Sequence, residues 1–118
     1  MIPGILQAGL VSAGTDIITV STERVKPGFM FHALSIVARD INNAVATYIE
    51  VGILDGTKEI PIDSTPGNFP ANTTHTVYWP CIIAEGQRVY AKFNAPTAGD
   101  KCEVYAHGFY EEMLPPCD

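Results

Sequence analysis

Short segments of strand-forming residues alternate with turn residues about every ten positions, and this spacing constrains the fold more than any other feature. The segments are rich in β-branched and aromatic residues, which are enriched in strands. Pro27-Gly28 and Asp55-Gly56 are the clearest turn signals, because proline presets φ and glycine accepts a positive φ. No long window has the charged, amphipathic pattern of a helix. Seven or eight short strands in 118 residues predict an all-β fold, a single-domain antiparallel β-sandwich that is jelly-roll-like.

Three segments carry signals for their place in a sheet. Residues 29–38 (FMFHALSIVA) are apolar on both faces, which predicts a central strand that is covered on both sides. Residues 58–62 (KEIPI) contain Pro61, which has no N–H to donate and therefore predicts a strand at a sheet edge. Residues 73–83 predict one strand that is kinked, or placed at an edge, by Pro80.

Alternation along two later segments places tyrosines on the outer surface. In residues 88–93 (RVYAKF) the apolar neighbours of Tyr90 face inward, so Tyr90 faces outward. Tyr105 has the same phase in the last strand, residues 102–112. Because exposed tyrosines anchor protein interfaces, both are candidate contact residues. A shift of the register by one residue would reverse these assignments.

The first fourteen residues, MIPGILQAGLVSAG, are uncharged, and no charged residue precedes Asp16. They lack the basic start of a secretory signal, and the apolar run is too short and interrupted to span a bilayer. We therefore expect them to be retained in a soluble product. Burial of their aliphatic side chains is worth on the order of several kcal/mol. The sequence predicts three parts: an N-terminal arm (1–14), a β-sandwich domain (15–112) and a C-terminal tail (113–118).

The arm has two alternative positions. It packs over its own sandwich, or it lies across a neighbouring subunit of a symmetric assembly, for which a homotrimer is the expected form. Apolar residues of the two chain ends, together with the two outward tyrosines, make up the expected interface. These residues are Ile2, Ile5, Leu6, Leu10, Val11, Tyr90, Tyr105, Met113 and Leu114.

Charge and cysteine content limit the partners and the setting. A net charge of −6 with only seven lysines and arginines argues against a nucleic-acid surface, which needs clustered basic groups. We expect no membrane partner either. The three cysteines, Cys81, Cys102 and Cys117, have no C-x-x-C spacing and are expected to be reduced thiols. Cys81 and Cys102 are expected to be small core residues, whereas Cys117, near the terminus, could cross-link subunits.

No motif for catalysis or metal binding is present. The histidines His32, His75 and His107 are far apart in sequence, and the His-x-His pair of metal-binding cupins is missing. The glutamates fall at turns or on the polar faces of strands, where solvated carboxylates are expected in any case. The sequence therefore predicts no metal, no cofactor and no enzyme activity.

The body from about Ser21 to Glu112 resembles the head decoration (cement) proteins of tailed bacteriophages, which are small, single-domain β-sandwich or jelly-roll proteins. The resemblance is a similarity of sequence pattern, without an invariant motif, in three segments: VKPGFMFHALSIVARDINNA, YIEVGILDGTKEIPI and AEGQRVYAKFNAPTAGDKCEVYAHGFYEE. The similar features are a Pro-Gly turn before an apolar strand and a polar break rich in asparagine, both in the first segment, and an EGQRV turn into the next strand in the third. The final GFYEE is also similar to trimeric jelly rolls of the complement and tumour-necrosis type.

The resemblance implies a structural virion protein that is made in the host cytoplasm and binds the capsid surface. Its partners would be the major capsid protein and other copies of itself, and it would act by contacts at subunit junctions. One alternative is a carbohydrate- or receptor-binding module of a phage tail or head fibre, which exposed aromatics in a concave patch would favour. Another is a cupin-like or hydrolytic jelly roll, which converging histidine and glutamate side chains would favour.

Overall fold

The chain forms two antiparallel β-sheets in a computed structural model that describes residues 2–12, 17–41, 48–65, 74–78, 80–94 and 99–113. These residues contain nine strands and no helix. The strands are β1 (Ile2–Val11), β2 (Ile18–Ser21), β3 (Phe29–Ile41), β4 (Tyr48–Asp55), β5 (Lys58–Ser64), β6 (Thr74–Val77), β7 (Cys81–Ile83), β8 (Arg88–Asn94) and β9 (Lys101–Glu112). One sheet has the order β1-β9-β3-β6, with β7 also paired to β3, and the other has the order β2-β8-β4-β5.

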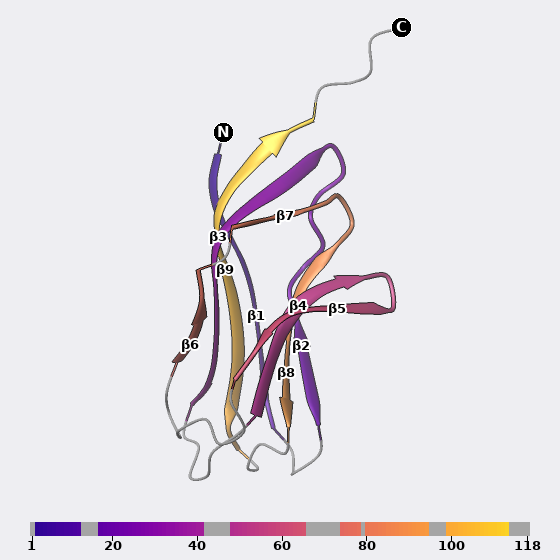
Figure 1. Ribbon diagram of the computed structural model, residues 1–118. Coiled ribbons are helices and arrows are strands. Elements are labelled where there is room, and N and C mark those ends of the chain that lie inside the picture. Colours follow the sequence, from indigo (N-terminus) through magenta and orange to yellow (C-terminus); the bar gives the residue numbers. More distant parts are fainter. Residues whose placement is uncertain are drawn as a thin grey trace, which may run out of the picture.

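The connectivity is that of a jelly roll. Strand pairs are nested along the chain: β1 pairs with β9, β2 with β8, β3 with β6 and β7, and β4 with β5. The chain is therefore one long antiparallel hairpin, rolled so that successive pairs fall in alternate sheets. Figure 1 shows the two sheets, with β1, β9, β3 and β6 in one layer and β2, β8, β4 and β5 in the other. The predicted single-domain, jelly-roll-like β-sandwich is confirmed.

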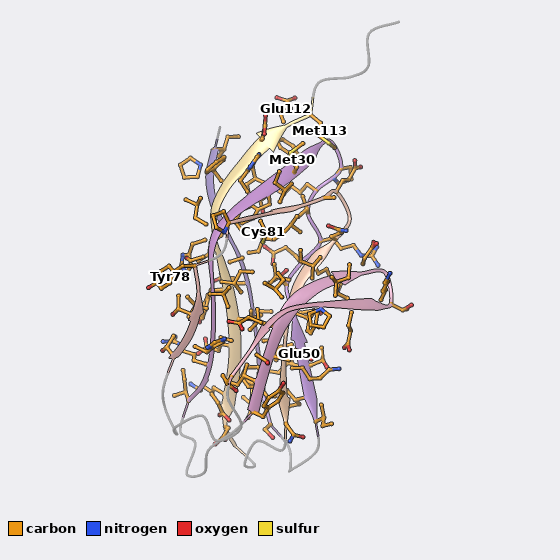
Figure 2. All side chains as sticks on the ribbon, viewed as in Figure 1. Met30, Glu50, Tyr78, Cys81, Glu112 and Met113 are labelled. Carbon is orange, nitrogen blue, oxygen red and sulfur yellow. The ribbon has the colours of Figure 1, made fainter. Side chains whose placement is uncertain are left out.

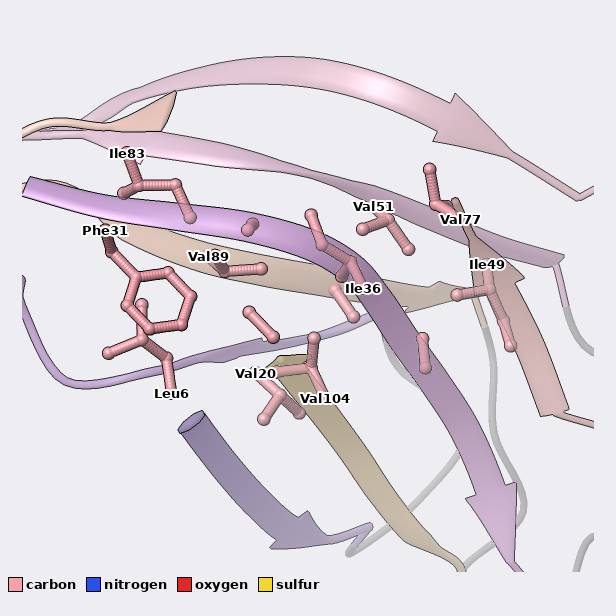
Figure 3. Close-up of a cluster of buried hydrophobic side chains, with 14 of the residues drawn as sticks. Leu6, Val20, Phe31, Ile36, Ile49, Val51, Val77, Ile83, Val89 and Val104 are labelled. Atoms are coloured by element: carbon pink, nitrogen blue, oxygen red, sulfur yellow. The ribbon is translucent and has the colours of Figure 1, made fainter. Parts of the chain in front are cut away.

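The core lies between the two sheets and is built from alternate residues of their strands. Leu6 of β1, Phe31 of β3 and Val89 of β8 meet in it from different strands (Figure 3). Full burial of each such side chain stabilises the fold by about 1.5–3 kcal/mol. The largest apolar side chains with almost no exposure are Leu6, Val20, Val25, Phe31, Ile36, Ile49, Val51, Ile83, Val89, Phe93 and Val104.

Strand β3 is central in its sheet, as expected, but it is not covered on both faces. Leu34 forms a β-bulge, because Ala33 pairs with Gly108 of β9 and Ser35 pairs with the preceding residue of β9. The extra residue changes the phase: Phe31 faces the core before the bulge, and Ile36 faces it after the bulge. This change of phase, rather than burial of both faces, explains why apolar residues occur at odd and even positions.

Residues 2–11 are a strand of the sandwich, so the predicted N-terminal arm is wrong over this part. Strand β1 pairs with β9 along its whole length, from Ile2 opposite Tyr110 to Val11 opposite Lys101. Leu6 is 0% exposed and belongs to the core. The physical reason is that β3 covers only one edge of β9, the last of the described strands, so the first strand of the nested hairpin covers the other edge.

Of the structural predictions based on prolines, those for Pro61 and for the Pro27-Gly28 turn are confirmed, and the one for residues 73–83 is corrected. Pro61 lies in the edge strand β5, as predicted. The single strand expected over residues 73–83 is instead two short strands, β6 and β7, with Pro80 between them, and both pair with β3. At the Pro27-Gly28 turn Gly28 has φ +84°, and the Phe29 amide donates to the Lys26 carbonyl at 3.1 Å, which confirms that turn.

Candidate interaction surface

The histidines do not converge on a metal site in the part of the chain that the structure describes. No group of three or more histidine, cysteine, aspartate or glutamate side chains in those residues could hold a metal ion. His75 instead lies beside Asp63, with 3.4 Å between Nε2 and Oδ2. Within the same ranges there is also no helix of the length and apolar character needed to cross a bilayer.

An apolar surface lies on the outer face of the five-stranded sheet. Cross-strand pairing brings Phe109 of β9, His32 of β3 and Ile82 of β7 into one row. The bulge adds Leu34, and the break between β6 and β7 adds Pro80, so that these five residues line a shallow hollow. Leu34 and Ile82 are 54% and 57% exposed, which is high for aliphatic side chains in a sheet. We call these five residues the outer patch.

His32 is held in place at the centre of the outer patch. Its Nε2 lies 2.5 Å from Oε2 of Glu111, the neighbouring outward position on β9. Its ring stacks on Phe109, with 4.8 Å between the ring centroids and 18° between the planes. Two contacts therefore hold the imidazole, one at a ring face and one at Nε2, and the surface around it is preorganised.

A charged cluster borders the same face farther along β3 and β9. Arg39 Nε donates to Glu103 Oε1 at 3.2 Å, and its guanidinium lies 5.4 Å from the centre of the Tyr105 ring. The Tyr105 hydroxyl donates to Glu103. The hydrogen bond to Tyr105, followed by the charge of Glu103, raises the pKa of Arg39, so this guanidinium remains charged. The outward position predicted for Tyr105 is confirmed.

Tyr90 has the predicted phase but is not an exposed contact residue, so this prediction is wrong. It is fully buried, and its hydroxyl donates to Glu50 Oε2 at 2.8 Å. Its ring lies against Gly52, where a Cβ atom would be 2.8 Å from the ring and 2.2 Å from the Ile60 carbonyl oxygen. Burial, and then the Glu50 carboxylate, raises the pKa of this phenol. The signal for this burial is Gly52 itself, because a glycine inside a strand marks a close approach of other groups.

The chain-end residues of the expected interface have different positions. Leu6 is a core residue, so its assignment to an interface is wrong. Ile5 and Val11 face outward on β1 and are exposed, whereas Ile2 and Leu10 are exposed near the two ends of the strand. Met113 is partly exposed, and its amide donates to the Gly28 carbonyl at 2.8 Å. Leu114 lies outside the described residues.

The described cysteines differ in burial. Cys102 is buried opposite Leu10. Cys81 lies at the start of β7 (Figure 2), is only half-buried and lines the same hollow as the outer patch. Burial, followed by the carboxylates of Asp40 and Asp100, raises the pKa of the Cys102 thiol from 9.0 to about 12. Burial also raises the pKa of Cys81. Cys117 lies outside the described residues.

Cys102 is expected to resist thiol reagents until the protein unfolds. In a Cys81→Ser/Cys117→Ser variant at about pH 8, the raised pKa lowers the thiolate fraction on the order of a thousandfold, and burial slows labelling further. Labelling by a maleimide, followed by mass spectrometry with and without denaturant, measures this protection. A Cys102→Ser/Cys117→Ser variant is the matched control and should label faster at the half-buried Cys81. Rapid labelling of native Cys102 would contradict its position in the core.

The described residues thus present an exposed, partly apolar surface that is suited to contacts with a partner. Apolar side chains gather around His32, and the cluster of Arg39, Glu103 and Tyr105 borders them on the same face of the sheet. Comparison with protein-family models and with curated proteins finds no match to this sequence.

Proposed function

We propose that this protein is a structural component of a virion, a decoration (cement) protein that binds the outside of an assembled tailed-phage capsid and stabilises it. Its main partner is the major capsid protein, and it is made in the host cytoplasm. The observation that carries this proposal is the outer patch, an exposed apolar surface on the outer face of the five-stranded sheet. The sequence resemblance to head decoration proteins supports the same function.

The proposed mechanism is burial of surface at the junctions between shell subunits. Leu34 and Ile82 already protrude into solvent, and each contributes about 1–3 kcal/mol when a partner covers it. His32 is fixed by Glu111 and Phe109, so little side-chain entropy is lost on binding. A ligand that binds only the assembled shell stabilises that shell by mass action.

Replacing Leu34 with aspartate is expected to lower binding to shells at least tenfold, because it buries a charge in the proposed contact. The fold should be kept, since Leu34 is 54% exposed and sits at a bulge. Ile17→Asp is the matched control, because Ile17 is also a well-exposed aliphatic residue but lies outside the outer patch. Co-sedimentation with shells assembled from the major capsid protein of the same virus measures binding, and thermal melting measures the fold.

Two results would contradict different parts of the proposal, the capsid-binding function or the choice of the outer patch as the binding surface. If the wild-type protein does not co-sediment with the shells, the capsid-binding function is wrong. If Leu34→Asp and Ile17→Asp bind as the wild type does, the protein binds shells through another surface.

A second candidate function is carbohydrate or receptor binding by a tail or head-fibre module. Tyr78 is 79% exposed and projects outward next to β6 (Figure 2). It lines a shallow hollow together with Asp63, Thr76 and Pro80. An exposed ring beside a carboxylate and a hydroxyl suits stacking and hydrogen bonding to a sugar. Binding on a glycan array that is lost in Tyr78→Ala would favour this function over capsid binding.

A further inference from the structure

We infer that β1 is a pairing edge through which two copies of this chain join antiparallel into one continuous sheet. Strand β1 is the last strand of the five-stranded sheet, so one of its two backbone edges has no neighbour among the described strands. It is ten residues long, pairs with β9 without a register shift, and carries no charged side chain. A long, regular and uncharged edge strand is the type of edge that pairs with another chain.

The other three sheet edges are protected. Strand β2 has only four residues. Strand β5 contains Pro61, charged side chains such as Lys58 and Asp63, and a register shift against β4. The remaining edge is divided into β6 and β7, with Pro80 between them. Among the four described edges, β1 alone lacks these devices apart from Pro3 near its start.

The backbone groups of β1 that are free to pair can be identified from its last contact with β9. The Ser12 amide donates to the Asp100 carbonyl, and the Ser12 carbonyl accepts from the Gly99 amide, both at 2.8 Å. Ser12 therefore directs both backbone groups toward the β9 side. Because antiparallel strands alternate at every residue, the even-numbered residues of β1 do the same. The odd-numbered residues, such as Ile5, Gln7 and Gly9, direct theirs toward the free edge.

A two-fold axis at Gln7 makes this edge self-complementary. Ile5 then lies opposite Gly9 of the second copy, Pro3 lies opposite Val11, and Gln7 lies opposite Gln7. The odd-numbered residues face one another, so about eight interchain hydrogen bonds form once the missing N–H of Pro3 is allowed for. Ile5 of each copy also meets Gly9 of the other, which leaves room for the isoleucine side chain at this directly opposed position.

The charge distribution also favours a second copy as the partner. Each copy carries −6, so close approach is least unfavourable along a strand without charge. In the two-fold arrangement the Lys101 end of one copy, next to Val11, lies at the same end as the acidic Glu111 and Glu112 of the other. The trimer expected from the sequence rests in part on a free arm, whereas β1 is paired with β9. The pairing does not depend on the proposed capsid function.

The two-fold register places residue 7 against residue 7, which allows a charge-exchange test. Gln7→Lys alone and Gln7→Glu alone each put like charges opposite one another, and each is expected to weaken the dimer at least tenfold. An equimolar mixture of the two variants is expected to restore association as a heterodimer. Thr19→Lys is the matched control, because Thr19 is an exposed residue of the short edge strand β2.

Sedimentation equilibrium over a concentration series, up to about 100 µM, measures association in solution without capsids. We expect the wild type and the Thr19→Lys control to dimerise equally well. Gln7→Lys alone and Gln7→Glu alone should dimerise weakly, and their equimolar mixture should dimerise as strongly as the wild type. A wild-type monomer at about 100 µM, a trimer, or a Gln7→Lys variant that dimerises as the wild type does would overturn the inference. If the mixture of Gln7→Lys and Gln7→Glu fails to associate, the register that places Gln7 opposite Gln7 is wrong.

Discussion

Deletion of residues 2–12 is expected to unfold the protein. The deletion removes β1, the whole antiparallel pairing with β9, and the core side chain of Leu6. Loss of Leu6 alone costs about 2–5 kcal/mol, and each lost hydrogen bond adds about 0.5–1.5 kcal/mol. The sum reaches the total stability of an ordinary domain, about 5–15 kcal/mol. Circular dichroism melting should show no cooperative transition, or a midpoint at least about 15 °C lower.

Two point variants measure the contribution of side-chain packing in the core while the backbone pairing of β1 with β9 is kept. Leu6→Ala is expected to destabilise the protein by about 2–5 kcal/mol, since Leu6 is 0% exposed. Leu10→Ala, on the same strand, removes a leucine that is 53% exposed and is expected to cost less than about 1 kcal/mol. Urea denaturation of both variants gives these differences. A deletion variant that melts as the wild type does would show that residues 2–12 are an arm after all.

The local strand pattern predicted most of the fold because it depends on neighbouring residues. Alternation of apolar residues at every second position identifies β4, β8 and β9, and the Asp55-Gly56 signal marks the hairpin between β4 and β5. Strand β1 was harder to predict, because Pro3, Gly4 and Gly9 weaken its strand propensity and its partner lies at the other end of the chain. Pairing between the first and last strands is a property of the whole topology, which a local pattern does not contain.

The interaction surface was only partly predictable for similar reasons. Alternation gives the phase of Tyr90 and Tyr105 correctly, but only the structure shows that Tyr90 is buried against Gly52. Leu34 was not singled out, although the sequence holds a signal for it: core positions change from odd at Phe31 to even at Ile36. Such a change of phase inside one strand indicates a bulge, and bulges often redirect side chains toward a functional surface.

The two proposed surfaces use different parts of the same sheet. The outer patch lies on the face formed by β3, β7 and β9, and the pairing edge is the backbone of β1. Pairing at the edge extends the sheet sideways and leaves its outer face open, so a dimer can present two outer patches on one surface. Two linked contacts bind more firmly than one when the spacing of sites allows both to engage.

Gly108→Ala is expected to cause the largest loss of stability of any glycine-to-alanine substitution in the described part of the chain. A Cβ atom at Gly108 would lie 1.8 Å from the His32 carbonyl oxygen and 2.9 Å from the His32 carbonyl carbon. Both atoms are backbone atoms of β3 at the Leu34 bulge, so they cannot move without separating the two central strands. We expect a loss of more than about 4 kcal/mol, which is exceptional for one substitution.

Gly9→Ala is the matched control for this substitution, because its Cβ atom would meet only the Glu103 side chain, at 3.4 Å, and a carbonyl oxygen at 3.7 Å. It should be neutral or should raise stability by up to about 1 kcal/mol, since alanine restricts the unfolded chain more than glycine does. Chemical denaturation at low protein concentration keeps any association through β1 out of the comparison. Equal midpoints for Gly108→Ala and Gly9→Ala would show that the bulge does not hold β3 and β9 at this close approach. In that case the position of Leu34 in the outer patch would need another cause.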